Sequence, residues 1–443
     1  MSKLISILGA GESGVGAAIL AKAKGYNVFV SDKGEIADKY KKELLQANIE
    51  FEEGNHSFDV ILSSIEVIKS PGIPDKIEII KQLRKKGIAV ISEIEFAARY
   101  TNAKLIGITG SNGKTTTTLL TYHLLKNLGL NVGLAGNIGV SFAKQVAYEN
   151  YDYYVLEVSS FQLDGILRFR PYISMILNIT PDHLDRYEYY FQNYVDAKFK
   201  ITSNLTPEDH FIYWNGDATV LDELQKRNLS CNLHPVSLEN NSSSVYSDGE
   251  FIHINYKSKN TSVAINELPI SGKHNQINMM CAIMVARLLE LDATLFQNVL
   301  NSFKNISHRL ELVRNYEGVQ YINDSKATNV DSVYYALDSM KTPVILIAGG
   351  VDKGNDYTHI EALIVEKVKA IVCMGVDNSK LFHAFEGKVK LVSTHSLYEA
   401  IEESQKLAIA GDTVLLSPAC ASFDLFKNYE DRGNQFMNIV NSL

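Results

Sequence analysis

Residues 3–25 of the chain read KLISILGAGESGVGAAILAKAKG, an apolar strand that leads into a glycine-rich turn and then into a helix. The turn from Gly9 to Gly14 fits the pattern G-x-G-x-x-G, and Asp32 follows at the end of NVFVSD. Such a turn and helix start bind phosphate through backbone N–H groups, and the acidic residue is typical of dinucleotide-binding folds. The stretch therefore predicts a doubly wound α/β domain. Taken alone, it favours a nicotinamide-dependent oxidoreductase.

The bulk composition indicates a globular protein with several domains. The chain has 443 residues, of which 46% are hydrophobic and 21% are charged, enough to bury large cores. The net charge of −8 argues against nonspecific nucleic-acid binding. No apolar run approaches the roughly 18–20 residues of a membrane helix, so we expect no membrane insertion. We expect a monomer.

The termini and the cysteines indicate a cytoplasmic protein. The apolar start runs into Gly-Ala-Gly-Glu without a cleavage-site pattern, so we expect no signal peptide. The four cysteines are far apart and form no C-x-x-C pair, which favours reduced thiols in the cytoplasm. Cys420 lies in the small-residue stretch SPACAS, and we interpret it as a buried structural thiol rather than a nucleophile.

Short β-rich runs alternate with helical patterns, which predicts three α/β domains with parallel sheets. We place them at residues 1–92, 93–300 and 301–443. The first and third are Rossmann-like, and the central one is P-loop ATPase-like with a small antiparallel addition after residue 210. In the first domain the expected strands lie at 4–8, 28–31, 60–62 and 89–91, and the expected helices at 15–24 and 75–86.

A second glycine-rich loop occurs in residues 107–118, GITGSNGKTTTT. It follows an expected strand at 105–109 and opens an expected helix at 115–128, which is the context of a P-loop. Lys114 can neutralise phosphate oxygens, and Thr115 can bind Mg²⁺. Ile108 stands where the pattern has its first glycine, so a structural turn is the alternative.

Three further side chains are candidates for a metal site. Glu157 ends the apolar run YYVLE, where a carboxylate would face Mg²⁺ beside the loop, although it could merely cap the next turn. His183 follows another expected strand, at 173–179, on the ligand-binding edge of the sheet, but loop histidines are more often structural. Lys198, in YVDAKFK, would by itself be a solvated helix lysine.

Eight motifs, taken in order, resemble the Mur ligase family of peptidoglycan synthesis. The motifs are GSNGKTT, EVSSFQL, NITPDHLDRY, AKFK, GKHNQIN, SHRLE, NDSKATN and SPACASFDLFKNYEDRG. The resemblance spans essentially the whole chain, and the last two motifs point to the family member that adds D-glutamate. It implies an ATP-dependent amide ligase that joins D-glutamate to UDP-N-acetylmuramoyl-L-alanine through an acyl phosphate. No protein nucleophile is needed, because positioning and charge neutralisation perform the catalysis.

The resemblance also implies a role for individual residues. The catalytic residues are Lys114, Glu157, His183 and Lys198. The ATP-binding residues are Gly110, Ser111, Asn112, Gly113, Lys114, Thr115, Thr116, Asn275, Asn278, Arg309, Asp324 and Lys326. Two Mg²⁺ ions are held by Thr115, Glu157, His183 and Lys198. Lys198 acts there as a CO₂-derived carbamate, which lysine can form and arginine cannot.

The resemblance likewise implies which residues contact each of the two substrates. The UDP-substrate contacts are Gly11, Glu12, Ser13, Asp32, Lys33, Gly72, Asn137 and His183. The D-glutamate contacts are Thr328, Lys353, Ser422 and Phe423. The family pattern has leucine at Phe423 and phenylalanine at Tyr429, so side-chain packing at the γ-carboxylate departs from it. The first glycine loop thus holds the diphosphate of the substrate rather than a dinucleotide.

Three other interpretations remain open at this point. An oxidoreductase would leave the second loop, Glu157 and His183 without a role. A related amide ligase is possible, either the L-alanine-adding enzyme or folylpolyglutamate synthase. The former carries a different C-terminal signature, and the latter lacks a comparable N-terminal domain. A nucleotide-sensing protein without turnover is the third, and only an assay excludes it.

Overall fold

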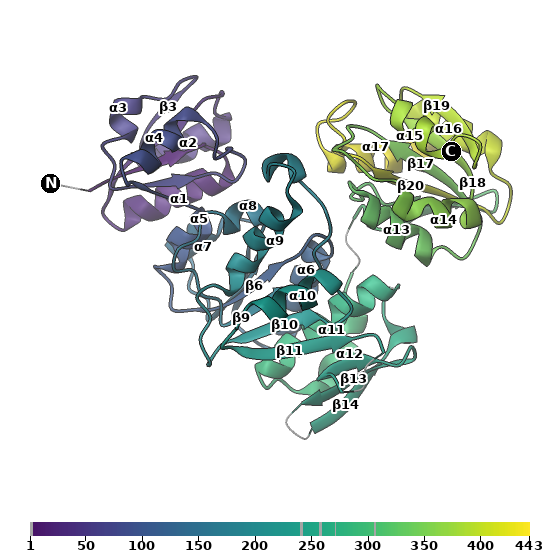
Figure 1. The fold of residues 1–443 in the computed structure, drawn as a ribbon, viewed down its shortest axis with the longest axis horizontal. Helices are drawn as coiled ribbons and strands as arrows, with labels where there is room; N and C mark the ends of the chain where they lie inside the picture. The colour runs from purple at the N-terminus through teal and green to yellow at the C-terminus, as the bar shows by residue number, and fades with distance from the viewer. Residues whose placement is uncertain (1–2, 240–241, 257–258, 271, 305–306) are drawn as a thin grey trace. The chain divides into compact units, whose positions relative to one another are not determined.

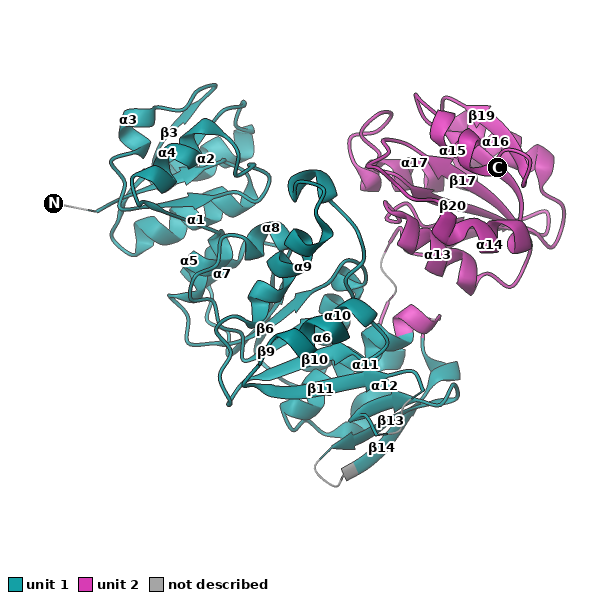
Figure 2. Cartoon of the chain, in the orientation of Figure 1, with its two compact units in different colours: residues 1–268, 276–302 teal, residues 269–275, 303–443 magenta. Residues whose placement is uncertain are grey.

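The computed structural model describes residues 3–239, 242–256, 259–270, 272–304 and 307–443. Within these ranges, three sheets follow one another along the chain, each flanked by helices (Figure 1). The chain divides into two compact units, residues 1–268 with 276–302 and residues 269–275 with 303–443 (Figure 2). The first two sheets share the first unit, and the third sheet lies in the second. The domain boundaries after residues 92 and 300 stay a prediction.

The first sheet is parallel, in the order β3-β2-β1-β4-β5. Its strands are β1 (Leu4–Leu8), β2 (Asn27–Asp32), β3 (Glu50–Glu53), β4 (Glu66–Lys69) and β5 (Ala89–Ile91). Its helices are α1 (Glu12–Ala23), α2 (Asp38–Gln46), α3 (Phe58–Ile61) and α4 (Glu78–Lys85). The glycine turn after β1 therefore opens at the carboxyl edge where the strand order reverses, which is the usual ligand crevice of such sheets.

Helix α1 packs closely on its neighbours because two of its residues are glycines. A Cβ at Gly14 would overlap Gly9 O in the turn after β1. A Cβ at Gly16 would overlap Ser141 Oγ, which lies just before helix α7 (Phe142–Tyr148) of the second sheet. Any larger side chain at either position would push α1 away from these partners.

The second sheet runs in the order β14-β13-β12-β11-β10-β9-β6-β8-β7. Its strands are β6 (Lys104–Thr109), β7 (Val132–Gly136), β8 (Tyr153–Glu157), β9 (Ile173–Ile176), β10 (His210–Trp214), β11 (Asn232–Ser237), β12 (Val245–Ser247), β13 (Phe251–Tyr256) and β14 (Lys259–Ala264). Its helices, besides α7, are α5 (Glu93–Ala98), α6 (Lys114–Asn127), α8 (Ser160–Leu163), α9 (Phe191–Phe199), α10 (Ala218–Lys226), α11 (Lys273–Leu288) and α12 (Phe296–Asn301). Strands β12 to β14 pair antiparallel, which confirms the predicted addition.

The third sheet runs in the order β15-β16-β20-β17-β18-β19, with only β15 antiparallel to its neighbour among the described strands. Its strands are β15 (Glu311–Tyr316), β16 (Val319–Asn323), β17 (Val344–Gly349), β18 (Val368–Met374), β19 (Lys390–Thr394) and β20 (Thr413–Ala419). Its helices are α13 (Val330–Ser339), α14 (Thr358–Lys367), α15 (Ser379–Phe385), α16 (Leu397–Leu407) and α17 (Tyr429–Ser442). One core lies under α13 to α15 and another under α16 and α17. Cys420 is buried beside the first, as predicted.

One predicted strand is wrong. Residues 60–62 belong to the end of the short helix α3, and the strand lies further on, at β4. A short apolar run does not distinguish a buried helical turn from a strand. Ile61 is fully buried against Leu8 and Val67, so its apolar character reflects packing under the sheet. The other expected elements are present, with ends shifted by a few residues. Among the described helices, none is both long and apolar enough to cross a bilayer.

Candidate active site

The loop between β6 and α6 forms a tight turn at the carboxyl edge of the second sheet. Gly110 has φ 155° and Gly113 has φ 83°, conformations that other residues rarely adopt. Asn278 of α11 approaches the loop closely, and its Oδ1 accepts a hydrogen bond from Thr117 Oγ1 at 3.0 Å. Thr115, in the first turn of α6, is buried. Small residues therefore precede a helix N-terminus, an arrangement that is typical of phosphate sites.

Two lysines converge on one carbonyl oxygen of this loop. Lys114 Nζ and Lys198 Nζ both donate to Gly110 O, at 2.8 and 2.7 Å. Lys198 is only 1% exposed, and its Nζ lies 4.5 Å from the centroid of the Tyr194 ring. Burial, followed by the positive charge of Lys114, lowers the pKa of Lys198 well below its usual value. The site therefore favours a neutral amine at Lys198.

Glu157, the last residue of β8, has one carboxylate oxygen without a partner. Asn137 N donates to Glu157 O, and Asn137 Nδ2 donates to Oε1, both at 2.8 Å. Oε2 is buried and accepts no hydrogen bond from any described residue. An unpaired buried carboxylate oxygen is costly, and it is also the kind of ligand that Mg²⁺ prefers.

His183 lies beyond β9 in a left-handed conformation, with φ 53°. Its side chain is 41% exposed, and Nε2 lies 3.6 Å from Asp182 Oδ2. While burial lowers the pKa of Lys198, the charges of Asp182 and Glu157 oppose that shift. The structure thus places Asp182, which the sequence did not single out, beside the predicted catalytic residues.

The predicted magnesium ligands fit the preferences of that ion. The described part of the chain contains no group of three or more His, Cys, Asp or Glu side chains arranged to hold a metal. Mg²⁺, however, is usually bound through one or two carboxylates together with substrate phosphates and water. The unpaired Oε2 of Glu157 supplies such a carboxylate oxygen, and the hydroxyl of Thr115 lies at the start of α6.

The glycine-rich loop between β6 and α6 also makes hydrogen bonds to two residues that sequence reasoning missed. Asn178, just after β9, accepts a hydrogen bond from Asn112 N at 2.8 Å and donates to Asn112 O at 3.1 Å. Ser111 N donates to Asn178 O at 2.9 Å. Tyr194 OH lies 3.1 Å from Ser111 Oγ. Asn178 opens the motif NITPDHLDRY and Tyr194 lies three residues before AKFK, but their contacts to the loop carry no local sequence signal.

The first glycine loop is held by Asp32. Ala10 N donates to Asp32 Oδ2 at 2.7 Å, and Gly34 N donates to Oδ1 at 2.8 Å. Gly11 is the N-cap of α1 and Ser13 lies in the first turn of the helix. The Asp32 carboxylate thus joins the turn after β1 to the turn after β2.

Two of the remaining predicted substrate contacts of the first sheet form hydrogen bonds to segments of the second. Glu12 Oε1 accepts a hydrogen bond from Ser141 N at 3.2 Å. Gly72 O accepts a hydrogen bond at 3.2 Å from Nη1 of Arg186, a residue that lies three positions after His183. Lys33 is exposed. Within the first compact unit, the start of α1 and the loop after β4 therefore lie next to segments that carry Asn137 and His183.

The residues predicted on the third sheet lie in the second compact unit. Asp324 is buried, and its carboxylate accepts hydrogen bonds from Ser417 Oγ at 2.8 Å and Leu310 N at 3.3 Å. Burial raises the pKa of Asp324 to about 7. Lys326 Nζ donates to Tyr429 OH at 3.0 Å, so the residue that departs from the family pattern contacts a predicted ATP ligand.

The predicted D-glutamate contacts differ in exposure. Ser422 is buried, whereas Phe423 is 73% exposed. The half-buried members of the predicted sites in this unit are Asn275, Arg309, Lys326, Thr328 and Lys353.

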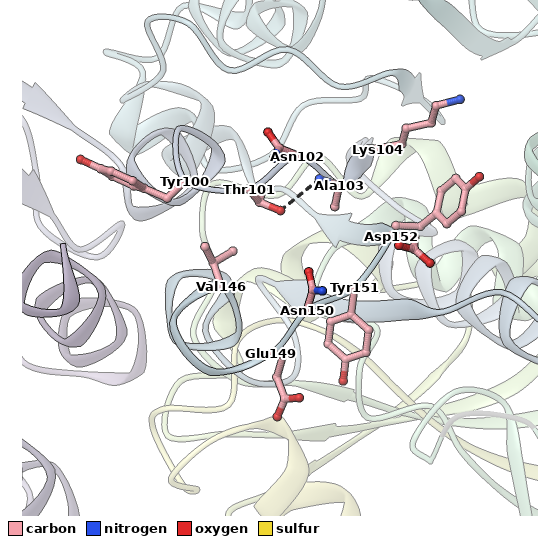
Figure 3. Close-up of a pocket in the computed structure, with 11 residues that line it drawn as sticks. Tyr100, Thr101, Asn102, Ala103, Lys104, Val146, Glu149, Asn150, Tyr151 and Asp152 are labelled. Carbon is pink, nitrogen blue, oxygen red and sulfur yellow. Dashed lines mark hydrogen bonds between the residues drawn. The ribbon is translucent and has the colours of Figure 1, made fainter.

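A separate cavity of about 440 Å³ lies at the amino ends of β6 and β8, the opposite end of these strands from the phosphate loop (Figure 3). It is lined by residues 100–104 and 149–153 together with Val146. None of the predicted site residues lines it.

Comparison with known proteins identifies the family. Residues 3–92 match the Mur ligase MurD-like N-terminal domain, residues 108–286 the Mur ligase middle domain, and residues 308–420 the Mur ligase glutamate ligase domain. The chain belongs to the Mur ligase family. A UDP-N-acetylmuramoylalanine--D-glutamate ligase of Cytophaga hutchinsonii is 55% identical to this Mur ligase, over 99% of both chains. One of Porphyromonas gingivalis is 51% identical over 99% of this chain and 98% of its own.

Solved structures confirm the fold class. A UDP-N-acetylmuramate-alanine ligase from Thermotoga maritima superposes with a TM-score of 0.63 at 17% identity, covering 100% of both chains. A pseudomurein peptide ligase type C from Methanothermus fervidus gives 0.64 at 20% identity, again over 100% of both chains. This Mur ligase thus has the predicted α/β fold with N-terminal, middle and C-terminal domains. The oxidoreductase that the first loop favoured by itself is set aside.

Proposed function

We propose that this Mur ligase uses ATP to join D-glutamate to UDP-N-acetylmuramoyl-L-alanine in peptidoglycan precursor synthesis. The observation that carries the proposal is the full-length identity of 51–55% with relatives named for this activity. The convergence of Lys114, Lys198 and Glu157 near one phosphate loop supports a phosphoryl-transfer site. ATP phosphorylates the substrate carboxylate, the amine of D-glutamate attacks the acyl phosphate, and phosphate departs.

In this proposal the loop at residues 110–116 binds the ATP phosphates. Backbone N–H groups and the start of α6 receive the phosphates, and Lys114 neutralises their charge. Lys114 now donates to Gly110 O and Ser111 O, so it exchanges these carbonyls for phosphate oxygens when ATP binds. Asn275, Asn278, Arg309, Asp324 and Lys326 complete the proposed ATP contacts.

Mg²⁺ would be held at two sites by Thr115, Glu157, His183 and a modified Lys198, and it would neutralise the phosphoryl oxygens. The buried, unpaired Oε2 of Glu157 supports this assignment. The neutral amine of Lys198 adds to CO₂ and releases a proton, which forms a carbamate. The burial and lowered pKa of Lys198 favour that step, because only the neutral amine has the required lone pair.

The two loops of the first sheet would hold the UDP end of the substrate. The proposed contacts are Gly11, Glu12, Ser13, Asp32, Lys33, Gly72, Asn137 and His183. On the third sheet, D-glutamate would contact Thr328, Lys353, Ser422 and Phe423. A lysine suits this ligand, because D-glutamate carries two carboxylates.

We further propose that the enzyme acts as a monomer in the cytoplasm, where ATP is available. Its four cysteines, Cys231, Cys281, Cys373 and Cys420, are buried free thiols, which supports a reducing compartment.

The proposal is tested by a panel of acceptors and amino acids. We expect Mg²⁺-dependent release of ADP and phosphate only when UDP-N-acetylmuramoyl-L-alanine and D-glutamate are both present. Equal turnover with UDP-N-acetylmuramate and L-alanine would contradict the assignment. ATP binding without turnover of any pair would instead support a nucleotide-sensing protein.

A further inference from the structure

Two glutamates from different elements converge on the start of helix α7. Ser141 Oγ donates to Glu93 Oε1 at 2.7 Å, and Ala143 N donates to the same oxygen at 2.6 Å. Ser141 N donates to Glu12 Oε1 at 3.2 Å. Glu12 lies in α1 of the first sheet, and Glu93 is the first residue of α5. The beginning of α7 is therefore fixed by carboxylates from outside its own helix.

Burying the carboxylate of Glu93 at this position costs free energy. Its side chain is 2% exposed, and its Oε2 has no hydrogen-bond partner in the part of the chain that the structure describes. Burial raises its pKa to about 7, and the nearby charge of Glu12 adds to the effect. An apolar residue would avoid this cost but would leave the hydroxyl of Ser141 and the N–H of Ala143 without their acceptor.

The segment that these contacts hold leads directly to the candidate active site. It comprises residues 137–141, with Ser141 at the end that the glutamates hold and Asn137 at the other end. Asn137 donates to both the backbone and the carboxylate of Glu157, at 2.8 Å each. This short segment is thus attached at one end to Glu157 and at the other to Glu93 and Glu12.

We propose that Glu93 and Ser141 are positioning residues for Asn137 and, through it, for the carboxylate of Glu157. They hold the segment 137–141 so that Asn137 occupies one oxygen of Glu157 and leaves the other available. The inference rests on the proposed roles of Asn137 as a substrate contact and of Glu157 as a magnesium ligand. Neither Glu93 nor Ser141 touches a reacting atom in this arrangement.

The test compares Glu93→Ala and Ser141→Ala with Glu93→Gln, which keeps an acceptor oxygen for Ser141 and Ala143. The matched control is Lys144→Ala. Lys144 joins α7 to Glu43 of α2 through an ion pair of 2.6 Å and so bridges the same two parts of the unit. For the first two variants we expect the KM for UDP-N-acetylmuramoyl-L-alanine and the Mg²⁺ concentration at half-maximal rate to rise roughly five- to twentyfold. The KM for D-glutamate should not change.

Glu93→Gln should restore most of the loss, and Lys144→Ala should behave like the unmodified enzyme. Calorimetric titration with UDP-N-acetylmuramoyl-L-alanine in the absence of ATP should show the same weakening without turnover. Unchanged KM, Mg²⁺ requirement and affinity in a folded Ser141→Ala variant would overturn the inference. A fall in kcat alone, with every KM unchanged, would also overturn it. If the unmodified enzyme turns over none of these substrates, it is the proposed function that fails.

Discussion

Replacing Lys198 by methionine should make the protein more stable while abolishing its activity. Lys198 is 1% exposed, and the carbonyl to which it donates, at 2.7 Å, also accepts from Lys114. A hydrogen bond from this amine contributes about 0.5–3 kcal/mol, whereas burying the amine costs several kcal/mol, whether it keeps its charge or gives up its proton on folding. Methionine keeps the apolar stem, and its sulfur can pack on the Tyr194 ring for about 0.3–1.5 kcal/mol. We therefore expect the free energy of unfolding to rise by roughly 1–3 kcal/mol.

The assay is urea denaturation in metal-free, CO₂-free buffer, so that no carbamate contributes, combined with measurement of ADP release under saturating substrates. Lys200→Met is the matched control, because Lys200 follows on the same segment but is 40% exposed and forms an ion pair of 2.7 Å with Asp164. It should change stability by less than about 1 kcal/mol and leave turnover intact. If Lys198→Met instead unfolds more easily by over about 1 kcal/mol, the buried amine stabilises the fold and our reasoning is refuted.

Three other predictions concern buried or paired side chains. Glu95→Ala should lower the free energy of unfolding by about 3–5 kcal/mol, because Glu95 is fully buried and its Oε2 accepts from the backbone N–H groups of residues 167–169; urea denaturation giving a loss below about 1 kcal/mol would contradict this. Tyr429→Phe removes one hydrogen-bond acceptor of Lys326 and should raise the KM for ATP roughly three- to tenfold without changing stability; steady-state kinetics with an unchanged KM would argue against it. The pKa of Asp324 is raised from 3.8 to about 7 by burial, so its contribution to stability is present below about pH 4 and is lost as pH rises toward 7. Asp324→Asn should flatten that decline in denaturation measured between pH 4 and 8, and an unaltered pH profile would show that the carboxyl titrates normally.

The sequence predicted the features whose signals are local. The strand, glycine-rich loop and helix around residues 110–116 were predictable because the glycines, the lysine and the flanking elements are contiguous. The same locality explains the error at residues 60–62, since a three-residue apolar run looks alike in a buried helical turn and in a strand. The antiparallel addition was predicted from alternating residues, whereas the antiparallel edge strand β15 was not.

The contacts that complete the candidate site are not local. Asn178 reaches Asn112 across 66 positions, and Glu93 reaches Ser141 across 48. No periodicity or motif spacing encodes such pairs, because they exist only after the sheets have formed. The burial of Lys198 belongs to the same class, since a helix lysine is expected to be solvated until the fold packs the loop at Gly110 against it.

The close approach of α1 and α7 constrains how this protein can diverge. A side chain at position 16 would collide with the hydroxyl of Ser141, and the smaller residue that would relieve the collision cannot donate to Glu93. Positions 16, 93 and 141 should therefore change together in descendants of this chain rather than independently. A homologue that gains a methyl group at position 16 should replace the serine, which leaves the buried glutamate with the backbone N–H of Ala143 but without the hydroxyl donor. An uncharged acceptor at position 93 then becomes more favourable than a buried carboxylate.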